Sequence, residues 1–480
     1  MKVFLTRNSQ YVNIFRAGHA AMQCAQLHGG QNYSTRAAAS YCGEEWVDAL
    51  GDDFKDLLLS STPSHFSGDY ASTSALIESR IRSGASTSSF LVANLSPVVY
   101  QYFQWCKELP MVEPFYAVKC NPDPVFLRLL ASLGCNFDCA TQGEMNLVLN
   151  HLGSELSFGP NGKAATSLIY AHPAKMDHML RYAVHNNVGM TVFDGEDELY
   201  KIASISGHEK LQVLLRLTTD DKASVCQFSK KFGCPVEEAP RLLEVAKSLG
   251  VNVAGCSFHV GSGCGDPSAY TTALEHCYRV FSSGEKIGMK PMTVVDIGGG
   301  FPGDTGGYGG ADMPTFQTLA GEIRNGISSF LAALPSTRSA DEIRFIAEPG
   351  RYFVSASTTI ATNIYSRKGG NGDHQALYVD DGVYGSFNNV VYDHATPMPR
   401  VIHCSPQSTG KNSVPIPTAV FGPTCDGLDQ ICPIDTTLLP RCEVGDWLTF
   451  DNMGAYTHTA SFVFNGYTHI PNKVYCFIQQ

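Results

Sequence analysis

From about residue 97 onward, short apolar runs alternate with stretches in which apolar residues recur every three or four positions. The short runs have the length of buried strands, and most of the stretches between them have the periodicity of amphipathic helices. The runs occupy residues 114–118, 135–138, 168–171, 190–193, 212–217, 253–260, 293–297 and 344–348. Eight strands that alternate with helices over roughly 250 residues predict a (β/α)8 barrel of the TIM type.

The clearest helix signal covers residues 124–134. Asp123 is a typical N-cap residue, Pro124 suits the first helical turn, and Gly134 can end the helix in a left-handed conformation. Similar helical patterns cover residues 176–187, 237–250 and 269–288.

The pattern changes after about residue 357. Strand-like segments at 375–382, 446–452 and 473–479 lie between turns rich in proline and glycine, and helical periodicity fades. We therefore expect an α/β protein in which a barrel is joined to a C-terminal β-sheet or β-barrel domain.

The expected domain limits follow from this change. Residues 94–357 form the barrel, and residues 60–93 and 358–480 form the β-domain, because residues 90–95 read as a strand entering the barrel. Residues 1–59 form a poorly defined N-terminal extension. Two glycine-rich stretches, 303–314 and 367–375, are expected to be surface insertions.

Charge and composition narrow the function classes. The 480 residues carry a formal net charge of −11 and no long cluster of lysine or arginine, which argues against nucleic acid and anionic membrane surfaces as partners. No apolar run approaches the length of a membrane span. The 16 cysteines include no C-x-x-C pair and no zinc-like spacing with histidine, so we expect reduced thiols, no metal site and a cytoplasmic protein.

One compositional feature points to a mitochondrial location instead. The first 43 residues contain no Asp or Glu and carry Lys2, Arg7, Arg16 and Arg36, a composition that weakly resembles a mitochondrial presequence. A loosely packed tail is the favoured interpretation, because the stretch has many uncharged polar residues and no clear amphipathic stripe.

Charged or special residues stand at the ends of nearly all the predicted strands. In a (β/α)8 barrel the carboxyl ends of the strands form the active site, so we expect these side chains to converge. They are Lys119, Asp138 with Glu144 just beyond, Asp194, Arg216, His259, Gly298–Gly300, and Glu348 with Arg351 three residues later.

Taken together, these residue types fit a single cofactor. A shielded amine such as Lys119 can form a Schiff base with a carbonyl. The backbone amides of Gly298–Gly300, the Ser262 hydroxyl and the Arg351 guanidinium can bind a phosphate. Glu348 can pair with a pyridinium nitrogen, which predicts pyridoxal 5'-phosphate.

Each residue also has a purely structural interpretation. Lys119 can simply mark a strand that reaches the surface, and the glycines can form only a tight turn. His259, which could stack on a cofactor ring, can equally be a hydrogen-bonded core histidine. Glu348 and Arg351 can form a structural ion pair. The placement of all these residues on consecutive strand ends favours the functional interpretation.

The motifs PFYAVKCNPDP, FDCAT, LRLTTDD, SFHVGSGC, DIGGGFPG, AEPGRYFV, DDGVYGSFNNVVYDHA, GPTCDGLD and NMGAYT carry a family resemblance. From about residue 88 to the C-terminus the chain resembles eukaryotic ornithine decarboxylases. These are barrel-type (fold type III) pyridoxal-phosphate decarboxylases with an architecture like that of alanine racemase. One departure is Thr141 in FDCAT, where serine is more usual, and the first ~85 residues match nothing.

The resemblance implies a role for each motif residue. Lys119 would carry the cofactor and return as a catalytic amine, His259 would stack on the ring, and Glu348 would hold the ring nitrogen. Other residues would complete the cofactor site: Asp138, Glu144 and Arg216 around the ring, and Ser262, Gly298, Gly299, Gly300, Arg351 and Tyr456 at the phosphate.

The β-domain would supply the substrate side of the site. Asp393 and Asp426 would bind the distal amine of a diamino acid, because a buried ammonium needs counter-charge. Cys425 would return a proton to the α-carbon, and Phe464 would line the pocket. Tyr384 could belong to the pocket or to dimer packing.

The resemblance also implies partners and a reaction. The loop with Cys425 and Asp426, and Phe464, would reach the cofactor from the neighbouring subunit of a homodimer, and antizyme is a possible partner. The implied reaction converts L-ornithine to putrescine and carbon dioxide in polyamine biosynthesis.

Three alternatives stay open. The substrate can be another diamino acid such as L-lysine, including in a specialised-metabolism paralogue, since pockets discriminate poorly over about one methylene. The chain can be a non-catalytic regulator like antizyme inhibitor, although such proteins lose cofactor-site residues that are present here. A barrel-type racemase would invert the amino acid and release no carbon dioxide.

Overall fold

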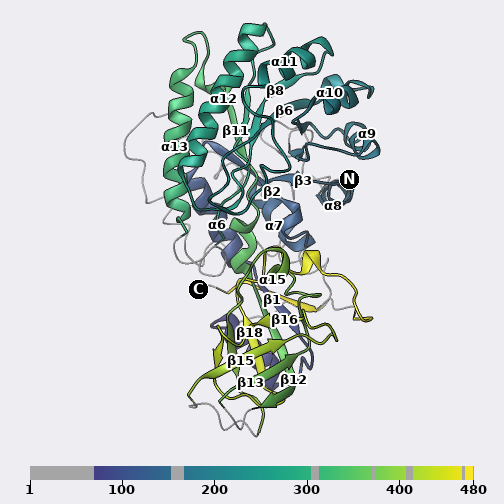
Figure 1. The fold of residues 1–480 in the computed structure, drawn as a ribbon, viewed down its shortest axis with the longest axis vertical. Helices are drawn as coiled ribbons and strands as arrows, with labels where there is room; N and C mark the ends of the chain where they lie inside the picture. Colours follow the sequence, from purple (N-terminus) through teal and green to yellow (C-terminus); the bar gives the residue numbers. More distant parts are fainter. Residues whose placement is uncertain are drawn as a thin grey trace, which may run out of the picture.

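The computed structural model describes residues 70–152, 167–303, 313–369, 373–406, 414–467 and 471–478. Two bodies are visible in Figure 1: a helix-ringed barrel, coloured blue to green, and below it a sheet domain that ends in yellow. The expected extension at 1–59, with its presequence-like composition, lies outside the described residues. So does most of the predicted insertion at 303–314, and residues 370–372 of the one at 367–375.

The barrel is a closed, all-parallel sheet of eight strands in the order β10-β11-β2-β3-β4-β5-β6-β8. Each of the eight predicted strands is present, so the predicted fold class is confirmed. The strands are β2 (Val112–Ala117), β3 (Asn136–Cys139), β4 (Leu168–Tyr170), β5 (Met190–Phe193), β6 (Gln212–Leu217), β8 (Val253–Phe258), β10 (Val294–Asp296) and β11 (Arg344–Ala347).

Helices follow the strands and surround the barrel, as α11, α12 and α13 show in Figure 1. Their bounds are α6 (Ser96–Glu108), α7 (Pro124–Leu133), α8 (Gln142–Leu152), α9 (Asp177–His185), α10 (Glu196–Ala203), α11 (Ala239–Ser248), α12 (Ser268–Ile287) and α13 (Phe316–Ala333). The predicted start and stop of α7 are confirmed. The Asp123 carboxylate accepts a hydrogen bond from Val125 N at 2.9 Å, and Gly134 adopts a φ of 97°.

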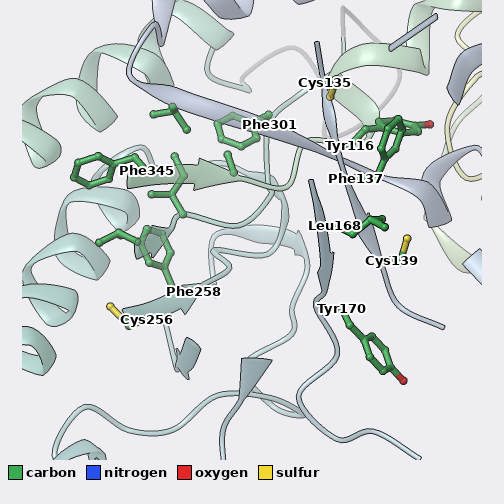
Figure 2. Close-up of a cluster of buried hydrophobic side chains, with 14 of the residues drawn as sticks. Tyr116, Cys135, Phe137, Cys139, Leu168, Tyr170, Cys256, Phe258, Phe301 and Phe345 are labelled. Atoms are coloured by element: carbon green, nitrogen blue, oxygen red, sulfur yellow. The ribbon is translucent and has the colours of Figure 1, made fainter. Parts of the chain in front are cut away.

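Successive residues of the barrel strands alternate between two apolar layers, as the period of a strand requires. Phe115 and Ile346 belong to a cluster drawn from the strands themselves, which fills the barrel interior. Their neighbours Tyr116 and Phe345 belong to the larger cluster shared with the helices, part of which is drawn in Figure 2. Packing on both faces therefore fixes the strands whose ends carry the candidate site.

The second domain is built on a nine-stranded sheet. Its strands are β1 (Phe90–Asn94), β12 (Thr358–Gly369), β13 (Gln375–Val379), β14 (Pro399–Ile402), β15 (Ile416–Phe421), β16 (Gln430–Cys432), β17 (Leu438–Leu439), β18 (Trp447–Phe450) and β19 (Asn472–Cys476). Helix α5 (Thr73–Arg82) packs its apolar face on this sheet through Leu76, Ile77 and Ile81.

One local prediction needs correction. Residues 90–95 were expected as a strand entering the barrel, but β1 lies in the sheet of the second domain, antiparallel to β12 and parallel to β19. The chain then enters the barrel through α6. The physical reason is that β1 is buried on both faces by partners from distant parts of the sequence, which a local apolar pattern does not reveal.

Within the described residues, no cysteine forms a disulfide bond, and most of the cysteines are buried. The same part of the chain contains no group of His, Cys, Asp and Glu arranged to hold a metal ion. None of its helices combines the length and the apolar character that crossing a membrane requires.

Candidate active site

Lys119 lies just beyond the end of β2, in a single 3₁₀ turn formed by Val118–Cys120. Its Nζ donates a hydrogen bond to Asp138 Oδ2 at 2.6 Å, and Asp138 ends the neighbouring strand β3. Desolvation by itself would lower the pKa of Lys119, but the charges of Asp138, Tyr456 and Glu348 and the hydrogen bond to Asp138 together outweigh it and raise that pKa. The pair therefore keeps the free amine charged and aimed across the barrel mouth.

Further acidic side chains surround this ion pair. Asp138 is fully buried, and its Oδ1 has no hydrogen-bond partner among the described residues. Glu144, at the start of α8, accepts a hydrogen bond from Ala140 N at 2.7 Å. Burial, followed by the charges of Asp296 and Asp138, raises the pKa of Glu348 well above its usual range. The site therefore favours the protonated form of Glu348 more strongly than water does.

Asp296 is a further site residue, which the sequence pattern did not single out. Its side chain is 1% exposed, and burial raises its pKa to about 7. It is the last residue of β10, two positions before the glycine triplet, so its place at a strand end was the available signal. It was passed over because the glycines after it attracted the phosphate interpretation.

His259 and Arg216 lie close to these carboxyl groups. His259 Nδ1 accepts a hydrogen bond from Gly261 N at 3.1 Å, so the ring proton is on Nε2. Burial, then the charges of Arg216 and Lys119, lowers the pKa of His259. The imidazole is therefore neutral, which suits stacking on a flat ring. Arg216 lies over the Phe232 ring, with its Cζ 5.2 Å from the centroid.

The glycine triplet passes close to other backbone and side-chain atoms. A Cβ added to Gly299 would lie 2.6 Å from His259 Nε2 and 3.0 Å from Glu348 O. Gly300 has a φ of +109°, in the region that favours glycine. This backbone therefore forms a narrow cradle directly beside the His259 imidazole and the backbone carbonyl of Glu348.

Arg351, at the start of the short helix α14 (Arg351–Val354), gathers the other predicted phosphate ligands. Its Nε donates to Ser262 Oγ at 3.0 Å, and its Cζ lies 4.4 Å from the centroid of the Tyr456 ring. Its NH2 group also forms a 2.5 Å ion pair with Asp393, which follows helix α15 (Asn389–Tyr392) of the second domain. One guanidinium thus joins the predicted phosphate site to the predicted substrate-amine site.

The remaining candidates form a separate group on the sheet domain. The Tyr384 hydroxyl donates a hydrogen bond to the Asp426 carboxylate, and the Tyr384 ring stacks on Phe464 with centroids 4.3 Å apart. Cys425 N donates to Asn465 Oδ1 at 3.3 Å, and Cys425 is exposed. Tyr384 also borders a cavity of about 540 Å³ between the sheet domain and residues 121–124 of the barrel.

Comparison with known proteins identifies the family to which this barrel belongs. The family model for the pyridoxal-binding domain of the pyridoxal-dependent decarboxylases matches residues 95–355, which include the Lys119 turn, the glycine cradle and Arg351. The chain belongs to this family. Its cofactor is accordingly pyridoxal phosphate.

Relatives within the family carry different names. The chain is 41% identical to antizyme inhibitor 2 of Xenopus laevis, over 80% of each chain. It is 39% identical to ornithine decarboxylase of Caenorhabditis elegans, over 79% of this chain and 86% of that one. Among solved structures, it resembles lysine/ornithine decarboxylase from Vibrio vulnificus complexed with cadaverine, with a TM-score of 0.71 and 29% identity over 86% of this chain and 99% of the other.

The barrel mouth of this decarboxylase-family chain fits the cofactor by its own chemistry. The Lys119 amine can react with the aldehyde, and the Asp138 oxygen without a partner can accept a hydrogen bond beside it. The tightly packed glycine backbone can present its N–H groups to a phosphate, which the Arg351 guanidinium can neutralise. A buried carboxyl, Glu348, is available for the ring nitrogen.

The Gly299→Ala variant should bind pyridoxal phosphate about 10- to 100-fold more weakly. The new methyl group meets both His259 and the Glu348 carbonyl, and overpacking of this kind costs about 1–3 kcal/mol. Titrating the cofactor into cofactor-free protein, followed by absorbance, measures the loss. Gly321→Ala in α13 is the matched control, since its nearest neighbour would be 4.0 Å away. Equal affinities for the two variants would contradict the cradle assignment.

Proposed function

We propose that the chain decarboxylates L-ornithine to putrescine and carbon dioxide, with pyridoxal phosphate held on Lys119. The observation that carries this proposal is the convergence of Lys119, Asp138, Glu348 and Arg351 at one end of the barrel. The choice of ornithine is supported by the identity to ornithine decarboxylases over about four-fifths of the chain.

The chain's own residues would bind the cofactor at three points. Arg351, Ser262 and the glycine backbone bind the phosphate, with Tyr456 beside the guanidinium. The Glu348 carboxyl holds the proton on the ring nitrogen, and the neutral imidazole of His259 covers one face of the ring. When bound, pyridoxal phosphate supplies the electron sink that accepts the electron pair left by the departing carboxylate.

Substrate binding and proton return involve both groups of residues. Asp393 and Asp426 would bind the distal ammonium of the diamino acid, because two carboxylates balance a buried cation. The α-carbon needs a proton after carbon dioxide leaves, and Lys119 Nζ and Cys425 Sγ are the groups proposed to deliver it. Cys425 and Phe464 would come from the neighbouring subunit, so we also propose a homodimer with shared sites.

Mixing two inactive variants tests the shared site. Lys119→Ala and Cys425→Ala remove groups that the proposal places on different subunits. In a symmetric dimer, random exchange of subunits makes about half of the dimers mixed, each with one intact site, so activity should recover to about a quarter of the wild-type value. Mixing either variant with itself is the control. If the mixture stayed as inactive as its components, both residues would belong to one subunit's site.

A substrate panel tests the choice of amino acid. L-ornithine, L-lysine, L-arginine and diaminopimelate are compared by released carbon dioxide. We expect the highest kcat/KM for L-ornithine and a value about 10- to 200-fold lower for L-lysine, which is longer by one methylene. A preference for L-lysine would support the alternative that the substrate is another diamino acid, including in a specialised-metabolism paralogue. The cadaverine bound to the Vibrio enzyme motivates this alternative.

The identity to antizyme inhibitor 2 supports a second candidate, a regulator that binds an antizyme without catalysis. The cofactor site argues for the enzyme, because the residues that would hold the cofactor converge on one end of the barrel. Purified protein that binds pyridoxal phosphate and releases carbon dioxide is an enzyme, whereas one that captures an antizyme and does neither is a regulator. Free buried thiols in the described residues support the further proposal of a cytoplasmic location.

A further inference from the structure

Asp296 lies close to Glu348, the residue assigned to the ring nitrogen. The Asp296 Oδ1 accepts a hydrogen bond from Gly298 N at 2.9 Å, and Gly298 O accepts one from Glu348 N at 2.7 Å. The two side chains also interact, because Glu348 acts on the pKa of Asp296 and the Asp296 charge raises the pKa of Glu348. The same glycine turn that begins the phosphate cradle therefore holds both the Asp296 carboxylate and the Glu348 backbone.

The surroundings of this pair favour a shared proton. Asp296 is 1% exposed and Glu348 is 7% exposed, and two buried carboxylates in contact repel each other if both are ionised. The other charges acting on the pair come from Asp138, Arg216 and, at Glu348, Lys119. On the neighbouring strand β8, Ser257 is the register partner of Asp296 and adds a neutral hydroxyl.

We propose that Asp296 is a positioning residue that shares a proton with Glu348 and adds its negative charge to the counter-charge that Glu348 would provide for a protonated cofactor ring nitrogen. The negative charge of Asp296 favours the protonated form of Glu348. If a neutral ring nitrogen lay beside Glu348, the shared proton could move to it, and the two carboxylates would become the counter-charge of the ring. No proton is gained or lost in this exchange.

The Asp296→Asn variant separates this role from a structural one. Asparagine keeps the shape, can still accept from Gly298 N, and can donate to Glu348, so the turn is preserved. It removes one negative charge from beside Glu348. A protonated ring nitrogen should therefore have less counter-charge and be less stable in the variant.

The test compares the affinities of pyridoxal phosphate and its 1-deaza analogue, which has carbon in place of the ring nitrogen. In the wild-type protein, pyridoxal phosphate should bind more tightly than the analogue. In Asp296→Asn this preference should shrink about tenfold, the change that corresponds to one pKa unit. Tyr270→Phe is the control, because the Tyr270 hydroxyl donates to Gly299 O at 2.9 Å and its loss disturbs the same turn without changing charge. It should weaken both ligands by the same factor.

The outcomes distinguish this inference from the proposed function on which it rests. An unchanged preference in Asp296→Asn, with a clear preference in the wild type, would overturn the role of Asp296 alone. No preference in the wild type would remove both the Glu348 assignment and this inference.

A second measurement needs no cofactor. The folded-state pKa of Asp296, about 7, is above the ordinary value near 3.9, so its contribution to stability is present at low pH and is lost as pH rises from about 4 through 7. Urea unfolding of cofactor-free protein at pH 5 and pH 8 should show a smaller loss of stability in Asp296→Asn than in the wild type. Identical losses of stability in the variant and the wild type would overturn the proposal that Asp296 and Glu348 share a proton.

Discussion

Turnover of the Lys119→Ala variant is expected to fall by at least about a thousandfold. The variant lacks the positioned amine, so an amine would have to come from solution. Lys119 is the amine that the barrel brings to Asp138 at 2.6 Å. Released carbon dioxide under saturating ornithine and cofactor measures the loss. The protein should remain folded, since the Lys119 side chain is 39% exposed and carries little of the core.

Lys222→Ala is the matched control for this variant. Its amine is 86% exposed and pairs only loosely with Asp220, at 3.5 Å, so turnover should be unchanged. Partial recovery of Lys119→Ala by added small primary amines would strengthen the assignment, because such amines can stand in for the missing group. Near-normal turnover without them would refute it.

The second large effect is expected at Glu348. In Glu348→Gln the ring nitrogen loses its carboxylate partner, and removal of one such electrostatic group costs about 10²–10³ in kcat. A single-turnover measurement of carbon dioxide release isolates the decarboxylation step from product release. Glutamine keeps the size of the side chain, so the loss would report charge and not packing.

Glu209→Gln makes the same chemical change at a position that is 63% exposed, and it should leave the single-turnover rate unaltered. A Glu348→Gln protein that decarboxylates at the wild-type rate would show that another group holds the ring nitrogen. Asp296 would then be the first residue to test, since it lies in contact with Glu348.

Much of the barrel could be predicted because its determinants are local. Each strand is a short apolar run, and Asp123 and Gly134 mark the ends of α7 by chemistry that acts within a few residues. The barrel topology then converts strand ends into a common site. Lys119, Asp138 and Glu348 could therefore be expected to converge although they are far apart in the sequence.

Other features depend on contacts that no local pattern encodes. The ion pair between Arg351 and Asp393 joins the barrel to α15, and β1 finds its partner β19 near the other end of the chain. Asp296 reads as an ordinary strand residue until its burial against Glu348 is known. Such contacts are decided by tertiary packing, which also placed residues 90–95 in the sheet and not in the barrel.

The most direct test of the account is to locate the covalent link between protein and cofactor. Borohydride reduction of the purified, cofactor-loaded protein fixes the link, and peptide mapping by mass spectrometry identifies the modified residue. We expect a phosphopyridoxyl group on Lys119. A stable adduct on another lysine, or none in folded protein saturated with pyridoxal phosphate, would contradict it.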